Sequence, residues 1–291
     1  MIYFLTVNYH STQLIEQLIN SIPTHPNIPY QIIIVNNSPE DKTIQNLKTK
    51  SLHILNSQTN LGFGNACNLG LNWIYNQNPN AIVWLINPDT YLPENTLEKV
   101  PTFFTSHPEV SILGTLIYTP RNDIWFAGGK FIPKIGAILT IDLLSSHPEK
   151  DYISCDWVSG CSLLINLCHF PECPKFNPAY FLYYEDFDFC QRYGMEGYQI
   201  AITSKLAVIH QPSSITNRNI REKFKHSTYS YLLTLEKYTN KTILFLRFFR
   251  LTLHAIILLI LKPKTAIGKL AGIFSYLKYY SSLLLKSGSK A

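Results

Sequence analysis

The first 118 residues contain short apolar runs that do not alternate with polar residues. These runs are Ile2–Val7, Gln31–Val35, Leu52–Leu55, Ala81–Ile86 and Val110–Tyr118. A continuous apolar run of this length is typical of a strand buried on both faces, and such strands occur in parallel sheets covered by helices. The runs therefore restrict this part of the chain to the α/β fold class.

The segments between the runs have helical spacing. Helices are expected from Ser11 or Thr12, from Asp41, over Gly62–Tyr75 and over Leu97–Phe104. Alternating strands and helices predict a mostly parallel sheet flanked by helices, whose ligand crevice lies at the carboxyl ends of the strands. The polar clusters Asn36-Asn37 and Asn87-Pro88-Asp89 follow two of those ends.

Beyond Tyr118 the pattern is less regular. Residues 119–152 carry Gly128-Gly129 and several prolines. We expect a strand over Val158–Ile165, a helix over Asp186–Tyr193 and short strands over Gln199–Thr203 and Leu206–Ile209. These elements complete a predicted catalytic domain over residues 1–211, with a donor half at about 1–118 and an acceptor half at about 119–211.

Charge divides the chain in two. Residues 1–211 hold 11 Lys and Arg against 17 Asp and Glu, a net charge of −6, whereas residues 212–291 hold 14 against 2, a net charge of +12. With 46% hydrophobic residues, wholesale disorder is excluded. The chain therefore reads as an acidic body, 1–211, followed by a basic tail, 212–291.

Several common classes of protein lack support in the sequence. The six cysteines form no C-x-x-C pair, so a zinc site and a disulfide scaffold are both disfavoured. No G-x-G-x-x-G, Walker A or G-x-S-x-G motif is present, which weakens dehydrogenase, P-loop and hydrolase interpretations. The first residues lack the basic segment of a signal peptide, so a cytoplasmic location is expected.

Two groups of side chains could carry chemistry. Asp89 follows a buried strand and could bind a hard cation or cap the next helix. His210, at another strand end, could be a metal ligand or a half-buried structural residue.

The second group is a cluster of carboxylates: Glu185, Asp186 and Asp188 lie within four positions. Neighbouring carboxylates in an apolar setting separate their pKa values, which suits one of them as a base, but they could also complement a helix dipole.

Seven segments recur in one order in a known family. They are Val7-x-Tyr9, Ile33-Ile34-Val35-Asn36-Asn37-Ser38, Asn60-Leu61-Gly62-Phe63-Gly64-x-x-x-Asn68-x-Gly70, Leu85-Ile86-Asn87-Pro88-Asp89, Trp157-Val158-Ser159-Gly160-Cys161, Tyr184-Glu185-Asp186-x-Asp188-x-Cys190-x-Arg192 and Val208-Ile209-His210. Over about residues 2–211 the chain resembles the inverting, metal-dependent GT-A glycosyltransferases of family 2. Within that family it is most similar to the rhamnosyltransferase-like group of bacterial cell-surface polysaccharide synthesis.

The resemblance implies a role for each motif. Residues in contact with the sugar nucleotide would be Val7, Tyr9, Asn36, Asn37, Gly62, Phe63, Asn68 and Asn87. Asn36 stands where the family usually has an Asp that reads the base, and its amide can still donate and accept hydrogen bonds. Asp89 ends the family's D-x-D motif, with Asn87 in place of the first Asp, and would hold Mg²⁺ or Mn²⁺ together with His210. Asp186 would be the catalytic base, and Glu185 would help to orient either Asp186 or the acceptor.

The implied reaction is transfer of a sugar, with a rhamnose-like hexose favoured, from a dTDP- or UDP-sugar. The acceptor would be a glycan or a polyprenyl-diphosphate-linked glycan, and transfer would invert the anomeric centre in one step. Two alternatives stay open: a catalytically inactive membrane scaffold of a polysaccharide assembly complex, and a nucleotidyltransferase that forms sugar nucleotides. The second is disfavoured because Asn8-Tyr9-His10-Ser11-Thr12 replaces the Gly-rich basic loop of those enzymes.

The basic tail is also strongly apolar. The window Ile243–Leu261 is long enough to cross a bilayer, but Arg247, Arg250 and His254 interrupt it. Apolar helices with Lys, Arg and aromatic residues are typical of an anchor lying in the plane of an anionic membrane. We therefore predict a peripheral location on the inner face of the cell membrane, with packed helices or a true span as alternatives. No motif accompanies the charge that would indicate nucleic-acid binding.

Overall fold

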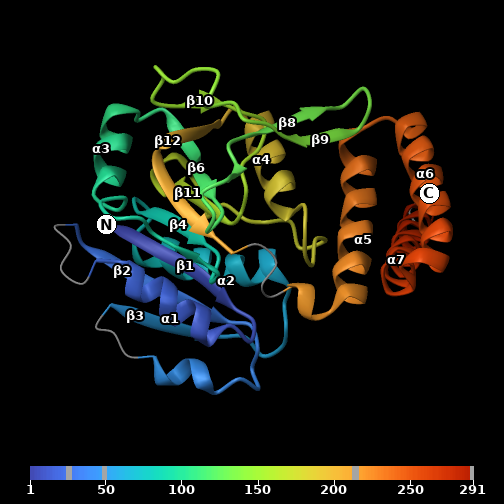
Figure 1. Cartoon of the computed structure of the whole chain (residues 1–291), viewed down its shortest axis with the longest axis horizontal. Helices are drawn as coiled ribbons and strands as arrows, with labels where there is room; N and C mark the ends of the chain where they lie inside the picture. Colours follow the sequence, from blue (N-terminus) through green and yellow to red (C-terminus); the bar gives the residue numbers. More distant parts are fainter. Residues whose placement is uncertain (24–27, 48–50, 212–215, 289–291) are drawn as a thin grey trace. The chain divides into compact units, whose positions relative to one another are not determined.

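Figure 1 shows the computed structural model, which describes residues 1–23, 28–47, 51–211 and 216–288. The internal contacts divide the chain into two units. The first comprises Met1–Lys130, Leu139–Ala179 and Glu185–Ile215, and the second comprises Phe131–Ile138, Tyr180–Tyr184 and Thr216–Ala291. The predicted boundary after residue 211 falls at residues 212–215, which lie outside the described residues.

The first unit is built on a sheet that has ten strands within the described residues. They are β1 (Ile2–Asn8), β2 (Tyr30–Asn36), β3 (Leu52–Asn56), β4 (Ile82–Ile86), β5 (Thr90–Tyr91), β6 (Val110–Tyr118), β7 (Ile124–Phe126), β10 (Ile153–Ser154), β11 (Ser162–Asn166) and β12 (Gln199–His210). The main path runs β10-β12-β6-β11-β4-β1-β2-β3, while β5 pairs with β12 and β7 with β6. A separate two-stranded ribbon joins β8 (Gly129–Ile132) to β9 (Ala137–Thr140).

Helices flank this sheet (Figure 1). The α-helices of the first unit are α1 (Thr12–Ser21), α2 (Phe63–Gln77), α3 (Lys99–Ser106) and α4 (Glu185–Met195), with 3₁₀ turns at Thr43–Asn46 and Leu167–His169. Helix α2 approaches β1 closely, because a Cβ atom at Gly70 would lie 2.2 Å from Leu5 Cδ1. Every residue of β1 is buried, as its continuous apolar run predicts. The predicted α/β fold with a sheet flanked by helices is confirmed.

Three expectations about individual elements are corrected. Strand β11 begins at Ser162 rather than Val158 and runs antiparallel to both of its neighbours, so the sheet is mixed. The two short strands expected near residues 199–209 form one strand, β12, with a register shift between Thr203 and Ala207. The helix expected from Asp41 is a single 3₁₀ turn.

The second unit contains three long helices. They are α5 (Ile220–Tyr238), α6 (Lys241–Leu261) and α7 (Pro263–Gly288). Asn219 and Asn240 cap α5 and α6 by accepting hydrogen bonds from the backbone N–H three residues later. Helix α7 lies close against α5, since a Cβ atom at Gly268 would lie 2.5 Å from the carbonyl oxygen of Arg221.

Candidate active site

The two predicted metal ligands lie side by side. Asp89 follows β4, and β5 then pairs antiparallel with the end of β12, so that Thr90 lies opposite His210. His210 Nε2 lies 3.2 Å from Asp89 Oδ1, and both side chains are buried. Two ligands at right angles around an ion, each about 2.1 Å away, are about 3 Å apart, so this pair fits one divalent cation.

The donor set also suits such an ion. A carboxylate oxygen with an imidazole nitrogen is a pair that Mn²⁺ and Mg²⁺ accept, though Mg²⁺ favours oxygen more strongly. The described residues contain no group of three or more His, Cys, Asp or Glu side chains that could hold a metal. The protein would therefore supply two ligands, and the remaining positions would be left to a bound anion and water.

The second predicted pair stands at the start of α4. Asp186 Oδ2 accepts a hydrogen bond from the backbone N–H of Gly160 at 2.9 Å, and Oδ1 accepts one from the N–H of Phe187 at 2.8 Å. Glu185 is 5% exposed, and its Oε2 has no hydrogen-bond partner among the described residues. The backbone therefore stabilises a charge on Asp186 and offers little to a charge on Glu185.

The electrostatics of this pair follow from burial. Burial, together with the charge of Asp186, raises the pKa of Glu185 to about 8. Burial also raises the pKa of Asp186, but the two backbone N–H groups act in the opposite direction. Hydrogen bonds from the backbone therefore favour the charged form of Asp186, whereas burial and the neighbouring negative charge oppose the charged form of Glu185.

A turn between residues 159 and 161 connects the two pairs. Gly160 N–H binds Asp186, and the carbonyl oxygen of the next residue, Cys161, accepts a hydrogen bond from Asn87 N–H at 2.9 Å. Burial raises the pKa of the Cys161 thiol, and the charges of Asp89 and Asp186 raise it further. Through these two hydrogen bonds the turn links Asp186 to Asn87, two residues before Asp89, at the same edge of the sheet.

The Gly-rich entry to α2 lies beside the base. Gly62 precedes the helix with a φ of 80°, a conformation that favours glycine. The Phe63 ring lies against Gly160, where a Cβ atom would be 3.4 Å from Phe63 Cε1 and 3.3 Å from Asp186 Cβ. Asn68 lies further along the helix, and its amide binds both the N–H and the carbonyl oxygen of Phe176, at 2.7 and 2.9 Å. Asn68 thereby positions a loop.

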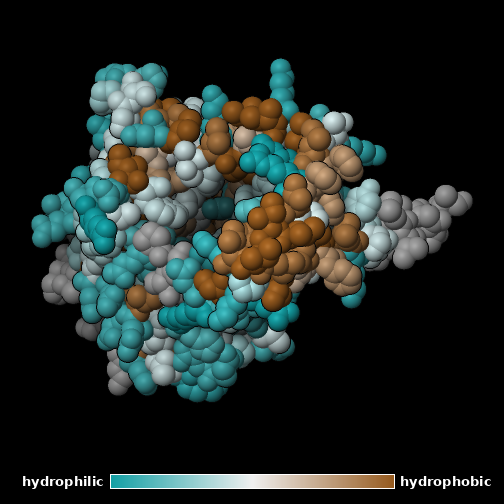
Figure 2. Space-filling view, turned by 45° about the vertical axis from the view of Figure 1, so that its right-hand side comes forward, coloured by the Kyte–Doolittle hydropathy of each residue, from teal (hydrophilic) through white to brown (hydrophobic). Residues whose placement is uncertain are grey.

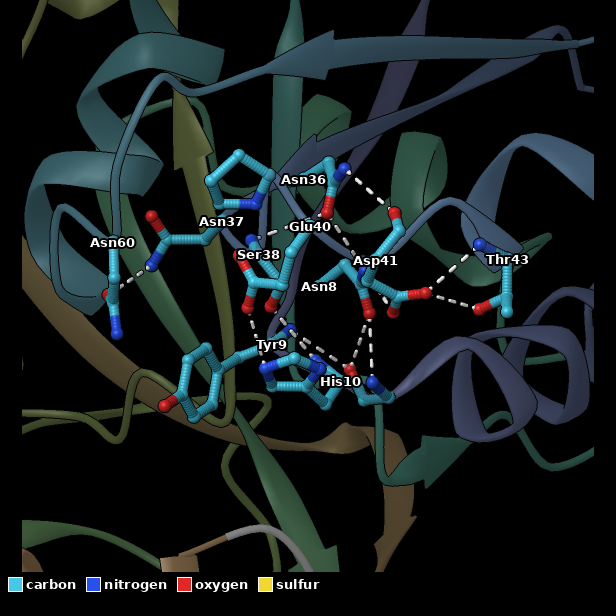
Figure 3. Close-up of polar contacts among 12 residues, drawn as sticks. Asn8, Tyr9, His10, Asn36, Asn37, Ser38, Glu40, Asp41, Thr43 and Asn60 are labelled. Carbon is cyan, nitrogen blue, oxygen red and sulfur yellow. Dashed lines mark hydrogen bonds and ion pairs between the residues drawn. The ribbon is translucent and has the colours of Figure 1, made fainter.

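The predicted role of Asn36 requires correction. Asn8, Asn36 and Asn56 end three neighbouring strands in register, and their side chains form a ladder of amides, of which Figure 3 shows Asn8 and Asn36. Asn8 Nδ2 donates to Asn36 Oδ1 at 3.0 Å, and Asn36 Nδ2 donates to Asn56 Oδ1 at 3.2 Å. Asn36 is 2% exposed, so its amide joins the strands rather than facing a base. Val7 is likewise buried and could meet a ligand only through its backbone.

Exposed side chains also lie near these strand ends, and two of them, His10 and Glu40, were not predicted from the sequence. His10 Nε2 lies 2.9 Å from Glu40 Oε1, and the Tyr9 ring, 43% exposed, lies 5.0 Å from the His10 ring (Figure 3). Asn37 Nδ2 donates to Asn60 Oδ1 at 2.9 Å and thereby holds the loop that leads to Gly62. In the sequence, His10 follows the polar end of β1 and Glu40 follows the Asn36-Asn37 cluster, and these positions could have indicated both residues.

Comparisons with known proteins identify the family of the chain. The family model for glycosyl transferase family 2 matches residues 3–156. The chain belongs to glycosyl transferase family 2. A low-salt glycan biosynthesis hexosyltransferase, Agl10 of Haloferax volcanii, is 24% identical over 212 residues, which cover 71% of this chain and 66% of that protein. N-acetylglucosaminyl-diphospho-decaprenol L-rhamnosyltransferase of Mycobacterium tuberculosis is 22% identical over 237 residues, covering 74% of this chain and 77% of that protein.

Solved structures show the same fold at low sequence identity. TarS of S. aureus matches with a TM-score of 0.52 and 16% sequence identity. The match covers 80% of this family 2 chain and 64% of the TarS chain. The mannosyltransferase PcManGT of Pyrobaculum calidifontis, solved with GDP-Man and Mn²⁺, has a TM-score of 0.54 and 16% identity, over 99% of this chain and 79% of its own. With the family match, these likenesses confirm the predicted GT-A fold.

Proposed function

We propose that this chain is an inverting glycosyltransferase that moves a sugar from a nucleoside-diphosphate donor to a hydroxyl of a glycan acceptor. One observation carries the proposal: the Asp89–His210 pair and Asp186 lie at the same edge of the sheet, where the turn at Gly160 and Cys161 is hydrogen-bonded to Asp186 and to Asn87, two residues before Asp89. A cation site next to a carboxylate base is what displacement of a diphosphate by a hydroxyl requires.

The residues divide the reaction between them. Asp89 and His210 would hold Mg²⁺ or Mn²⁺, which when bound supplies positive charge to offset the charge of the leaving diphosphate. Asp186 accepts the proton of the attacking hydroxyl, and Gly160 and Phe187 fix its carboxylate through their backbone N–H groups. Attack on the side opposite the leaving group would invert the anomeric centre. Glu185, with its pKa raised, would add little negative charge beside Asp186, and its free Oε2 could help to orient the acceptor.

Donor and acceptor classes rest on the relatives. The Mycobacterium tuberculosis relative is named as an L-rhamnosyltransferase acting on a diphospho-decaprenol sugar, which supports a rhamnose-like hexose and a polyprenyl-diphosphate-linked acceptor here. A dTDP- or UDP-sugar is the proposed donor, with the exposed Tyr9 ring offering a stacking surface for a base. Gly62, Phe63, Asn37 and Asn87 are proposed as further contacts of the donor.

Incubation with a panel of sugar nucleotides tests the proposal without an acceptor. We expect slow release of nucleoside diphosphate from one or a few donors in Mn²⁺, because water can replace the acceptor hydroxyl at low rates, and little release in excess EDTA. Equal release of nucleoside diphosphate in Mn²⁺ and in EDTA would contradict the proposed role of Asp89 and His210 as metal ligands.

We also propose a peripheral location on the inner face of the cell membrane. Helix α6 has 21 residues, and its most apolar window has a mean hydropathy of 2.1, so by length and composition alone it could cross a bilayer. Only 6% of that window is buried. Its large exposed apolar residues are Phe245, Leu246, Phe249, Leu253, Ile256, Ile257, Leu259, Ile260 and Leu261. Figure 2 shows a large apolar patch on the surface (brown). Arg250 and His254 are also exposed, which favours a helix lying in the interface.

Flotation with liposomes tests this location. The full chain should float with vesicles containing anionic phosphatidylglycerol and bind neutral phosphatidylcholine vesicles less. Substituting Phe249, Ile256 and Ile260 by serine should remove most of the binding, because these exposed side chains would enter the interface. Met195→Ser is the matched control, since Met195 is 72% exposed and lies in the first unit. Undiminished flotation of the triple variant would rule out α6 as the anchor.

A further inference from the structure

Trp125 presents a large aromatic side chain next to the proposed metal pair. It lies in β7, which pairs antiparallel with β6. The register places Phe126 opposite Ile117 and Ile124 opposite Tyr118, so Trp125 is the extra residue of a β-bulge. Bulges re-aim a side chain and occur next to active sites.

The bulge directs the indole toward His210. The ring centroids of Trp125 and His210 are 4.6 Å apart, in an edge-to-face arrangement. Trp125 remains 38% exposed, whereas His210 is 4% exposed. Trp125 is partly buried against His210 and keeps part of its indole open to solvent, so a ligand bound at the Asp89–His210 pair could pack on that open part.

We infer that Trp125 forms the aromatic wall of the subsite for the donor's sugar ring. The inference rests on the proposed function, in which Asp89 and His210 fix the donor diphosphate. The sugar is bonded directly to that diphosphate, so a ring in contact with His210 is within reach of the sugar.

The chemistry of the two rings is complementary. One face of a hexose presents C–H groups, and a deoxyhexose adds a methyl group, so both can pack on an indole face. Removal of Trp125 should therefore weaken binding of the sugar nucleotide without weakening binding of the bare nucleoside diphosphate. A tenfold loss of affinity corresponds to about 1.4 kcal/mol, within the range for an aromatic contact.

Calorimetry on the full chain in Mn²⁺ separates these effects. The probes are dTDP-rhamnose and UDP-glucose, each compared with its own nucleoside diphosphate. Trp125→Ala should bind the sugar nucleotide about tenfold more weakly than the parent chain but bind the nucleoside diphosphate equally well. Trp125→Phe, which keeps an aromatic ring, should lose less affinity for the sugar nucleotide than Trp125→Ala. Ile124→Ala is the matched control, because Ile124 is the preceding residue and is 46% exposed.

Each outcome decides between two accounts. Equal weakening of both probes by Trp125→Ala would make Trp125 a support of His210 and overturn the inference, as would no weakening of either. Retained donor affinity with a raised acceptor KM would assign the ring to the acceptor and also overturn it. If the parent chain bound neither nucleoside diphosphate in Mn²⁺, the proposed function itself would fail, and this inference with it.

Discussion

Asp186→Asn should reduce sugar transfer by about 10²- to 10⁴-fold, the usual contribution of a positioned general base. The amide keeps the size of the carboxylate and can still accept a hydrogen bond from Gly160 N–H. Binding of the sugar nucleotide should therefore survive while proton removal is lost. The measurement is the transfer rate together with donor affinity by calorimetry.

Glu185→Gln is the matched control for that variant. Because burial and the charge of Asp186 raise the pKa of Glu185 to about 8, its side chain is neutral near pH 7, and a neutral amide of the same size changes little. We expect a far smaller loss of rate than for Asp186→Asn. The reverse order of the two losses would make Glu185 the base, and parallel loss of donor affinity and rate in Asp186→Asn would make Asp186 structural.

Asp89→Ala should remove the metal-dependent part of donor binding, roughly a 10- to 100-fold loss of affinity in Mn²⁺. The reason is the 3.2 Å separation between Asp89 Oδ1 and His210 Nε2, which lets one ion bind both. Calorimetric titration with the sugar nucleotide in Mn²⁺ and in EDTA gives the two affinities. The variant should bind in Mn²⁺ about as the parent binds in EDTA.

The double variant Asp89→Ala/His210→Ala makes this prediction sharper. Two ligands of one ion act as a unit, so the double variant should lose little more affinity than Asp89→Ala alone. Additive losses would indicate two independent contacts with the donor. An unchanged titration of Asp89→Ala in Mn²⁺ would contradict the metal site.

The fold was predictable where local sequence determines it. The runs that became β1 and β4 are apolar throughout, and strands buried on both faces need no further information. The start of β11 was not predictable, because Val158 is as apolar as the strand itself. Residues 159–161 leave the strand to bind Asp186 and Asn87, and those partners come from distant parts of the chain.

The candidate site divides in the same way. Glu185 and Asp186 are adjacent in sequence, so their mutual effect was predictable. The position of Asn36 depends on Asn8 and Asn56, which meet it only because β2 lies between β1 and β3. Trp125 gave no sequence signal, since its orientation depends on the bulge opposite β6.

The identity of the phosphorus-containing product tests the central claim most directly. The full chain is incubated in Mn²⁺ with the sugar nucleotide that it binds most tightly, and the products are followed by ³¹P NMR. A metal-dependent glycosyltransferase should release the nucleoside diphosphate, and Asp186→Asn and Asp89→Ala should each suppress that release. Inorganic diphosphate in its place would indicate a nucleotidyltransferase, and no phosphorus product from any donor would indicate an inactive scaffold. Either result would contradict the account.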